Sequence, residues 1–216
     1  MIRALRSVRP IAADIATAVD GVMNAYRDQR VIEEPAITNQ ILGAIEARLQ
    51  VRNYKGIVWN AKVLRTARGR AAEEQRHGAD LLGVLDVDVG NFRTKKGFLA
   101  QAKKAEPGQS FTKLEWTRLV DQCKKMLDRT PASFVFVYSV EKGLRIIPAV
   151  SVVGFDGLDL FDLYQRAVQP FFEGFLECFI GDPRLNAPDI HMLDALANFE
   201  VDRVLAITAK KTVTDI

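Results

Sequence analysis

The segment at residues 78–104, GADLLGVLDVDVGNFRTKKGFLAQAKK, decides the fold. Its first part, residues 81–89, is rich in β-forming side chains and ends at Gly90-Asn91, a dipeptide typical of a tight turn. An apolar stretch resumes at residues 97–103. The pattern therefore predicts a β-hairpin, and we expect the basic residues 93–96 to form its tip.

Apolar periodicity and Pro or Gly signals predict the elements on either side of this hairpin. Helices are expected at residues 11–27, 37–51, 112–129, 158–180 and 191–199. Strands are expected at residues 57–59 or 62–65, 134–138, 144–147 and 204–208. Because helices alternate with strands and with a hairpin, the expected fold class is α/β (α+β), with a mixed central sheet flanked by helices.

The composition of the 216 residues is that of an ordinary globular protein, with a formal net charge of +3. Two Cys and two His cannot build a disulfide framework or a Cys/His zinc site. We expect an N-terminal helical arm at residues 1–30, followed by a single domain at 31–216 that ends in a C-terminal helical extension. No stretch has the pattern of a signal peptide or a membrane span, so the expected location is the cytoplasm, without membrane contact.

The charges are distributed unevenly along the chain. Residues 47–72 contain seven basic residues and no acid, whereas residues 151–200 contain nine acids and two bases. Such asymmetry favours a polyanion partner on one face. A solvated surface is the alternative explanation for a charge run of this kind.

The end of the second hairpin strand carries two polar side chains inside an apolar run. Gln101 and Lys103 are two residues apart, so they project from the same face of a strand, and a hairpin can bring Asp80 beside them. Asp80, the side-chain carbonyl of Gln101 and the backbone carbonyl of Ala102 offer the oxygen ligands that Mg²⁺ prefers. Lys103 would then orient a water and stabilise charge on a phosphate. The alternative is that Gln101 and Lys103 are ordinary surface residues.

The order Asp80, strand, Gln101-x-Lys103 resembles the PD-(D/E)XK nuclease superfamily, and most closely its GxD…QxK branch of Mrr-like restriction endonucleases. The resemblance implies a restriction-endonuclease-like fold whose two core helices are residues 37–51 and 112–129. It also implies DNA as the substrate and Mg²⁺ or Mn²⁺ as the cofactor. In this family the position of Gln101 usually holds Glu.

Further residues near the motif are candidates for the same site. Glu74 precedes the Gly78-Ala79-Asp80 motif and is our second-choice catalytic carboxylate. A solvated or incidental surface position is the alternative for Glu74 and for the others, which are Glu46, His77, Asp86, Asp88 and Gln122.

The basic residues before Asp80 and at the expected hairpin tip are the candidates for phosphate contacts, which give affinity rather than sequence reading. They are Arg52, Lys55, Lys62, Arg65, Arg68, Arg70, Lys95 and Lys96. The aromatic cluster at residues 171–179 is expected in the core, with a homodimer interface as the alternative.

Three functions therefore follow as hypotheses. The first is a metal-dependent DNA endonuclease of a restriction or phage-defence system, which a partner or sensor protein would control. The second is a catalytically silent DNA-binding or assembly module with the same fold. The third is an unrelated α/β interaction protein.

Overall fold

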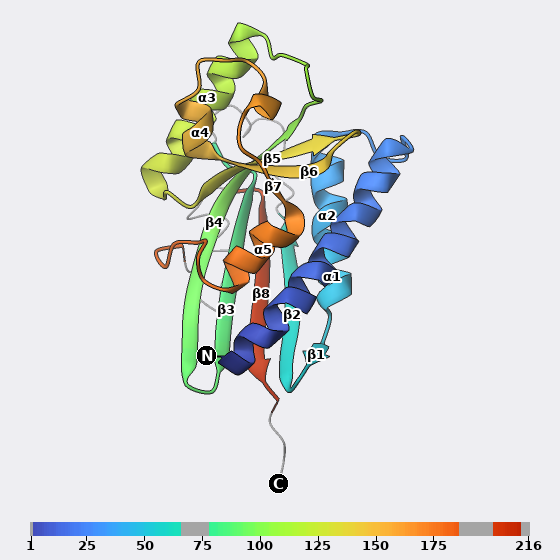
Figure 1. Ribbon diagram of the computed structural model, residues 1–216, viewed down its shortest axis with the longest axis vertical. Helices are drawn as coiled ribbons and strands as arrows, with labels where there is room; N and C mark the ends of the chain where they lie inside the picture. The colour runs from blue at the N-terminus through green and yellow to red at the C-terminus, as the bar shows by residue number, and fades with distance from the viewer. Residues whose placement is uncertain (1, 66–77, 186–200, 213–216) are drawn as a thin grey trace.

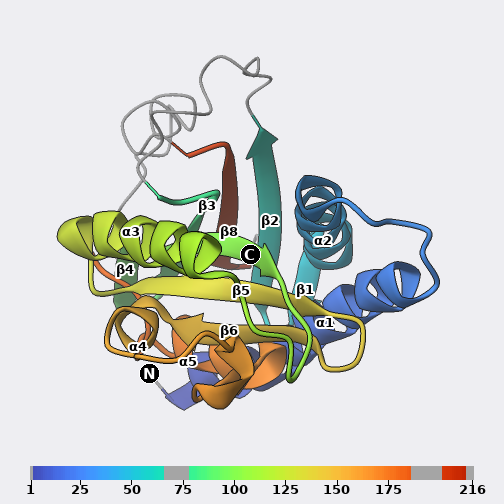
Figure 2. The ribbon, with the colours of Figure 1, turned by 90° about the horizontal axis from the view of Figure 1, so that it is seen from above.

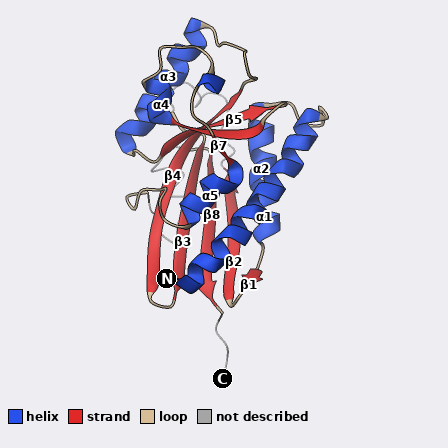
Figure 3. Cartoon of the chain, in the orientation of Figure 1, coloured by secondary structure: helices blue, strands red, loops and turns tan. Residues whose placement is uncertain are grey.

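The computed structural model describes residues 2–65, 78–185 and 201–212. Eight strands form one mixed sheet with helices on both faces, which confirms the predicted α+β class (Figure 1). Figure 3 separates the sheet from the helices that cover it.

The sheet has the strand order β1-β2-β8-β3-β4-β5-β6-β7. The pairs β3/β8 and β4/β5 are parallel and the other neighbours are antiparallel. The strands are β1 (Arg52–Tyr54), β2 (Ile57–Arg65), β3 (Leu81–Val89), β4 (Phe92–Lys104), β5 (Ser133–Ser139), β6 (Gly143–Pro148), β7 (Arg166–Ala167) and β8 (Arg203–Lys211).

Helices α1, α2 and α5 pack on one face of the sheet, and α3 and α4 pack on the other. Figure 2 shows α3 on the opposite side of the sheet from α1 and α5. The helices are α1 (Ile2–Arg27), α2 (Glu34–Leu49), α3 (Lys113–Arg129), α4 (Ala149–Val153) and α5 (Val168–Leu176), with a short 3-10 helix η2 (Leu160–Asp162).

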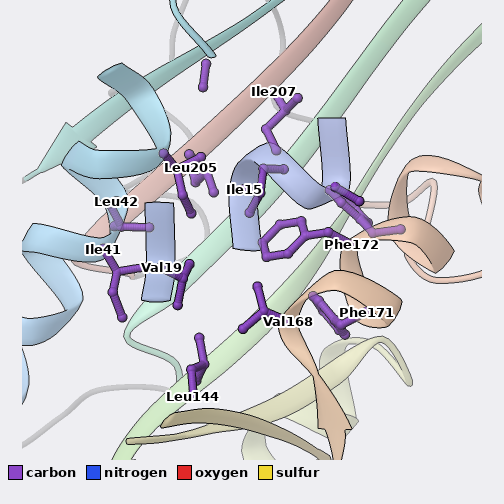
Figure 4. Close-up of a cluster of buried hydrophobic side chains, with 14 of the residues drawn as sticks. Ile15, Val19, Ile41, Leu42, Leu144, Val168, Phe171, Phe172, Leu205 and Ile207 are labelled. Atoms are coloured by element: carbon purple, nitrogen blue, oxygen red, sulfur yellow. The ribbon is translucent and has the colours of Figure 1, made fainter. Parts of the chain in front are cut away.

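The N-terminal helix is part of the core, so the expected separate arm is not what the structure shows. Ile11, Ile15 and Val19 recur at every fourth position, and this spacing gives α1 one continuous apolar stripe. Figure 4 shows Ile15 and Val19 among Leu205 and other side chains of the core. Burying each such side chain contributes about 1.5–3 kcal/mol.

The single helix predicted at residues 158–180 is wrong. The structure has η2, then β7, and only then α5. Asp159 caps the start of η2, where its carboxylate accepts hydrogen bonds from the backbone N–H of Phe161 and of Gly108. The helix is interrupted after η2 because Arg166–Ala167 pair with β6 instead. Pro170 lies in the first turn of α5, where its missing N–H costs nothing. The expected aromatic cluster is buried at Phe171, Phe172 and Phe175, whereas Phe179 is 85% exposed.

The hairpin is confirmed, but its basic residues are not at the tip. The turn is only Gly90-Asn91, and β4 begins at Phe92. The basic residues after Phe92 belong to strand β4, and acids of the neighbouring strand β3 face them. Arg93 pairs with Asp88, and Lys95 pairs with Asp86. These pairs make the polar outer face that was expected for Asp86 and Asp88.

Two further predictions concern the C-terminal part of the chain. The predicted strand at residues 204–208 is β8, and it inserts between β2 and β3 rather than lying at an edge. The predicted helix at 191–199 lies outside the described residues. Within the described ranges, no helix has the length and apolar character needed to cross a membrane.

Candidate active site at the start of β3

Asp80 lies directly before β3 and opposite the end of β4. Its backbone N–H donates to the carbonyl of Ala100 at 2.9 Å, which continues the ladder between the two strands. Its Oδ2 accepts from Gln101 Nε2 at 2.5 Å and from the backbone N–H of Ala102 at 2.9 Å. Gln101 is only 4% exposed, so a buried amide holds the carboxylate in place. The expected meeting of Asp80 and Gln101 is therefore confirmed.

Gly78, two residues before Asp80, determines how closely the chain approaches α3 as it enters the site. It has a φ of +88°, and a Cβ there would lie 2.3 Å from the backbone oxygen of Gln122 on α3. Only glycine permits both the left-handed conformation and this close approach. The chain therefore passes tightly under α3 before Asp80. Gln122, a sequence candidate, contributes its backbone to this contact.

Lys103 lies two residues after Gln101 on β4, so the two side chains leave the same face of the strand. Burial raises the pKa of Asp80. The hydrogen bond from Ala102 and then the ammonium of Lys103 oppose this rise. A half-buried cation thus acts on a carboxylate that has lost most of its contact with water.

A second carboxylate, Glu34, reaches the site from the first turn of α2. Its Oε2 accepts from the backbone N–H of Lys104 at 3.1 Å. Burial raises the pKa of Glu34, and the charge of Asp80 raises it further, whereas Lys103 lowers it. Nothing in the sequence pointed to a role for this acid in the site. Its place in the site depends on how α2 packs against the end of β4.

Strand β8 adds two more charges. Arg203 pairs in register with Leu81, so Asp202 and Arg203 lie beside Asp80 at the same end of the sheet. The charge of Arg203 lowers the pKa of Asp80 and that of Asp202 raises it. Arg203 Nε also donates to Asn39 Oδ1 on α2 at 2.7 Å. Sequence reasoning missed both residues because a parallel pair formed by distant segments leaves no local signal.

The other candidate acids have different places. Glu46 accepts from the backbone N–H of Val63 at 2.9 Å, and this contact ties α2 to β2. Asp86 and Asp88 lie farther along β3 in the cross-strand pairs already described. Glu74 and His77 lie outside the described residues.

The expected phosphate-binding residues are spread over the whole sheet. Arg52 binds Asp14 at 3.0 Å, and Lys55 is in the β1–β2 turn, at the end of the sheet opposite to Asp80. Lys62 is exposed on β2, and Arg65 pairs in register with Arg203, at the end of the sheet that carries Asp80. Arg68 and Arg70 lie in a part of the chain that the structure does not describe.

Lys95 and Lys96 do not form the basic hairpin tip that was expected to contact phosphate. Lys95 forms an ion pair with Asp86 at 3.3 Å. Lys96 is only 3% exposed, and its ammonium donates to the backbone carbonyls of Phe175 and Ile180. A buried ammonium in this position cannot contact a phosphate, so Lys96 is a structural residue.

The donor set of the site suits a hard divalent cation. Mg²⁺ is commonly held by one or two carboxylates together with water and substrate phosphate. Asp80 supplies a carboxylate, and the amide of Gln101 lies against it. The carbonyl of Ala102 faces the same amide, accepting from Gln101 Nε2 at 3.3 Å. Among the residues with a described position, no three His, Cys, Asp or Glu side chains form a ready metal cage. The part of Gln101 that faces Asp80 and Ala102 is the amide nitrogen, so the predicted oxygen set of carboxylate, amide and backbone carbonyl requires the amide to turn over.

Comparison of the chain with protein-family models, with curated proteins and with solved structures found no match. The fold and the site together define an α+β domain in which a buried Gln101 joins the half-buried Asp80 and Lys103 at one end of the central sheet.

Proposed function

We propose that the chain is a DNA endonuclease that depends on Mg²⁺ or Mn²⁺, with Asp80, Gln101 and Lys103 in its active site. One observation carries the proposal. The half-buried Asp80 carboxylate accepts a hydrogen bond from the buried Gln101 amide on the neighbouring strand, and Lys103 leaves the same strand face as Gln101. By resemblance to the nuclease superfamily, we extend the proposal to a role in restriction or phage defence. The proposal also includes control of the activity by a partner protein or a second copy. A cytoplasmic location is consistent with a DNA substrate.

The residues of the chain divide the chemistry between them. Asp80, the carbonyl of Ala102 and, once its amide has turned over, the oxygen of Gln101 would hold the cation, which supplies Lewis-acid stabilisation of the phosphate. Lys103 neutralises charge on the scissile phosphate and holds the attacking water in line. A P–O bond forms to the oxygen of water as the P–O bond to one of the two bridging sugar oxygens breaks. Glu74 remains a candidate second carboxylate from the sequence.

The electrostatics of the site support cation binding. Beyond the effect of burial, the charge of Asp80 raises the pKa of Glu34, and the charge of Asp202 raises the pKa of Asp80. A bound divalent cation relieves this repulsion and favours ionised carboxylates, so its affinity should increase with pH. Lys103 and Arg203 add positive charge beside the carboxylates, where a phosphate would lie.

The test is cleavage of supercoiled plasmid with Mg²⁺, followed on gels for nicked and linear products. Asp80→Asn and Lys103→Ala should each lower the rate by about 10²-fold or more, because each removes a charge at the reacting phosphate. The matched control is Lys210→Ala, an exposed lysine on β8 at the far end of the sheet. Equal cleavage by wild type and both site variants would reject the site.

The second candidate is a silent DNA-binding module with the same fold. The observation that favours it is that an amide occupies the position of the family's usual acid and already satisfies the Asp80 carboxylate. This candidate predicts a gel shift without metal, weakened steeply by salt, and no cleavage with any divalent cation. Absence of both DNA retardation and cleavage would leave the interaction protein as the remaining hypothesis.

A further inference from the structure

A pocket with two basic residues opens beside strand β6, on the face of the sheet that carries α3 and α4. It has a volume of about 380 Å³. Arg145 pairs in register with Val137, which belongs to the core under α3 and α4, so its side chain leaves the sheet on that face. The described residues that line the pocket include no acid, and they are Pro107, Lys142, Arg145, Phe161 and Gln165. This lining favours an anion.

Arg145 is a cation that lacks an anion. The residue is half-buried, yet its guanidinium has no hydrogen-bond or ion-pair partner in the part of the chain that the structure describes. A guanidinium has five N–H donors, and removing its charge from water without a partner costs free energy. Lys142 pairs with Glu141 at 2.6 Å, but both side chains are exposed, so this pair contributes little and can be exchanged. Two cations are therefore available for one anionic group, and the guanidinium suits a phosphate.

Two carboxylates hold the walls of the pocket in place. Asp159 is buried and accepts hydrogen bonds from the backbone N–H of Gly108 and of Phe161, so it joins the loop after β4 to η2. Glu106 accepts from the backbone N–H of Val140 at 2.6 Å, and this bond joins the same loop to the β5–β6 turn. The walls therefore have their positions without a ligand, and these two carboxylates already bind N–H groups.

An aromatic ring and an amide give the pocket a second chemical character. Phe161 is half-buried, because it packs against the core under α3 and α4 and also lines the pocket. Its ring and that of Pro107 offer apolar surface on which a nucleic-acid base can stack. Gln165 Nε2 donates to the carbonyl of Phe161 at 3.1 Å, which directs the amide along this wall, and its oxygen can accept an N–H of the base.

We propose that this pocket binds a nucleotide, with the phosphate on Arg145 and Lys142 and the base on Phe161. A free nucleoside monophosphate and one unit of a single DNA strand share this chemistry. The strand is a possible source because Arg145 is in register with Lys103 across one intervening strand, so roughly 10 Å separates their Cα atoms. The proposal does not depend on the nuclease function, since none of Asp80, Gln101 and Lys103 lines the pocket.

The probes are adenosine monophosphate (AMP), adenosine and ribose phosphate, titrated into the full chain by calorimetry. EDTA is present, so that divalent cations do not contribute to binding at the Asp80 site. AMP should bind at least about tenfold more tightly than adenosine, because its phosphate accepts charged hydrogen bonds. It should bind at least about fivefold more tightly than ribose phosphate, which has no base to stack.

Two variants separate the two halves of the pocket. Arg145→Gln should weaken AMP at least about tenfold and leave adenosine unchanged, because it removes the charge and keeps a side chain of similar length. Phe161→Leu should reduce the affinity of AMP to that of ribose phosphate. The matched control is Lys210→Ala, which removes an exposed cation at the far end of β8 and should bind AMP as the wild type does. Thermal melting checks that each variant is folded.

A short single strand of oligodeoxyadenylate distinguishes the two sources of the nucleotide. Displacement of AMP by the strand, with both ligands weakened in Arg145→Gln, supports the pocket as a site for one unit of a strand. AMP that the strand does not displace supports a site for the free nucleotide. Three results would each overturn the proposal: no binding of AMP at millimolar concentration, equal affinities for AMP and ribose phosphate, or an unchanged affinity for AMP in Arg145→Gln. Because DNA cleavage is not the readout, failure here is separate from failure of the nuclease proposal.

Discussion

Two carboxylates of this protein are held in opposite electrostatic states. Burial raises the pKa of Asp80, so folding disfavours its ionised form. At Asp182 the hydrogen bond from Arg184 is the main reason why the pKa is lowered, and Thr130 also donates to this carboxylate. Folding therefore favours the ionised form of Asp182. A raised pKa, as at Asp80, is typical of a functional carboxylate, whereas a lowered pKa, as at Asp182, is typical of a structural one.

Asp80→Asn should make the protein more stable at neutral pH. With a raised folded pKa, Asp80 binds protons more tightly in the native state, so its contribution to stability falls as the pH rises past its unfolded pKa. Asparagine keeps an acceptor for Gln101 and Ala102 without the charge. We expect Tm to rise by about 2–4 °C at pH 7, as roughly 1 kcal/mol does in a chain of this size, and to change little below pH 4.

Asp182→Asn is the matched control with the opposite sign. The lowered pKa of Asp182 gives stability that is present above its unfolded pKa, near 4, and is lost as the pH falls toward the folded pKa. The variant should lower Tm at pH 7 by an amount on the order of 1 kcal/mol. A lower Tm for both variants at pH 7 would contradict the assignment of Asp80.

Gly78→Ala should disturb the site through the backbone alone. A methyl group there meets the carbonyl of Gln122 in addition to the cost of a positive φ. Gly90→Ala is the matched control, because Gly90 also has a positive φ but its Cβ position is open. We expect a loss of about 1 kcal/mol for Gly90→Ala and about 2–4 kcal/mol for Gly78→Ala in urea unfolding. Equal losses would mean that the approach to α3 carries no cost.

At the scale of elements, the hairpin and the end of α5 are joined by one buried lysine. Lys96 projects from β4 and donates to carbonyls on either side of Cys178, while its ammonium lies 4.7 Å from the ring centre of Phe175. Burial lowers the pKa of Lys96 to about 8. The contact satisfies the carbonyl of Phe175 in the last turn of α5 and that of Ile180 in the loop that follows.

The stability of the protein should therefore increase with pH in the alkaline range. Between about pH 8 and the unfolded pKa near 10.4, the native state binds fewer protons at Lys96 than the unfolded state, so the free energy of unfolding rises. In Lys96→Met this rise should vanish, as measured by urea unfolding from pH 7.5 to 10. The exposed neighbour variant Lys95→Met should retain it.

Element prediction succeeded where the signal was local. The hairpin followed from a turn dipeptide between two β-rich runs, and this register alone brings Asp80 to Gln101. The prediction of one helix at 158–180 failed because residues 166–167 pair with β6, a tertiary contact that leaves no local signal. Glu34 and Asp202 could not be assigned to the site, because α2 and β8 reach it only through tertiary packing.

At the scale of the whole molecule, α1 belongs to the same core as the sheet. Ile15→Ala should lower the free energy of unfolding by about 2–5 kcal/mol, as expected for a fully buried isoleucine. Asp20→Ala on the exposed side of the same helix should change it by less than about 0.5 kcal/mol. Similar small effects for both variants would mean that α1 is a dispensable arm.

The position of β8 has a consequence for how the protein is made. This strand lies between β2 and β3, yet the chain reaches it only after α3, β5, β6 and α5 have been synthesised. Until then the two halves of the sheet have unpaired edges facing each other, and Asp202 and Arg203 are missing from the site. A nascent chain therefore carries Asp80, Gln101 and Lys103 without their complete electrostatic surroundings.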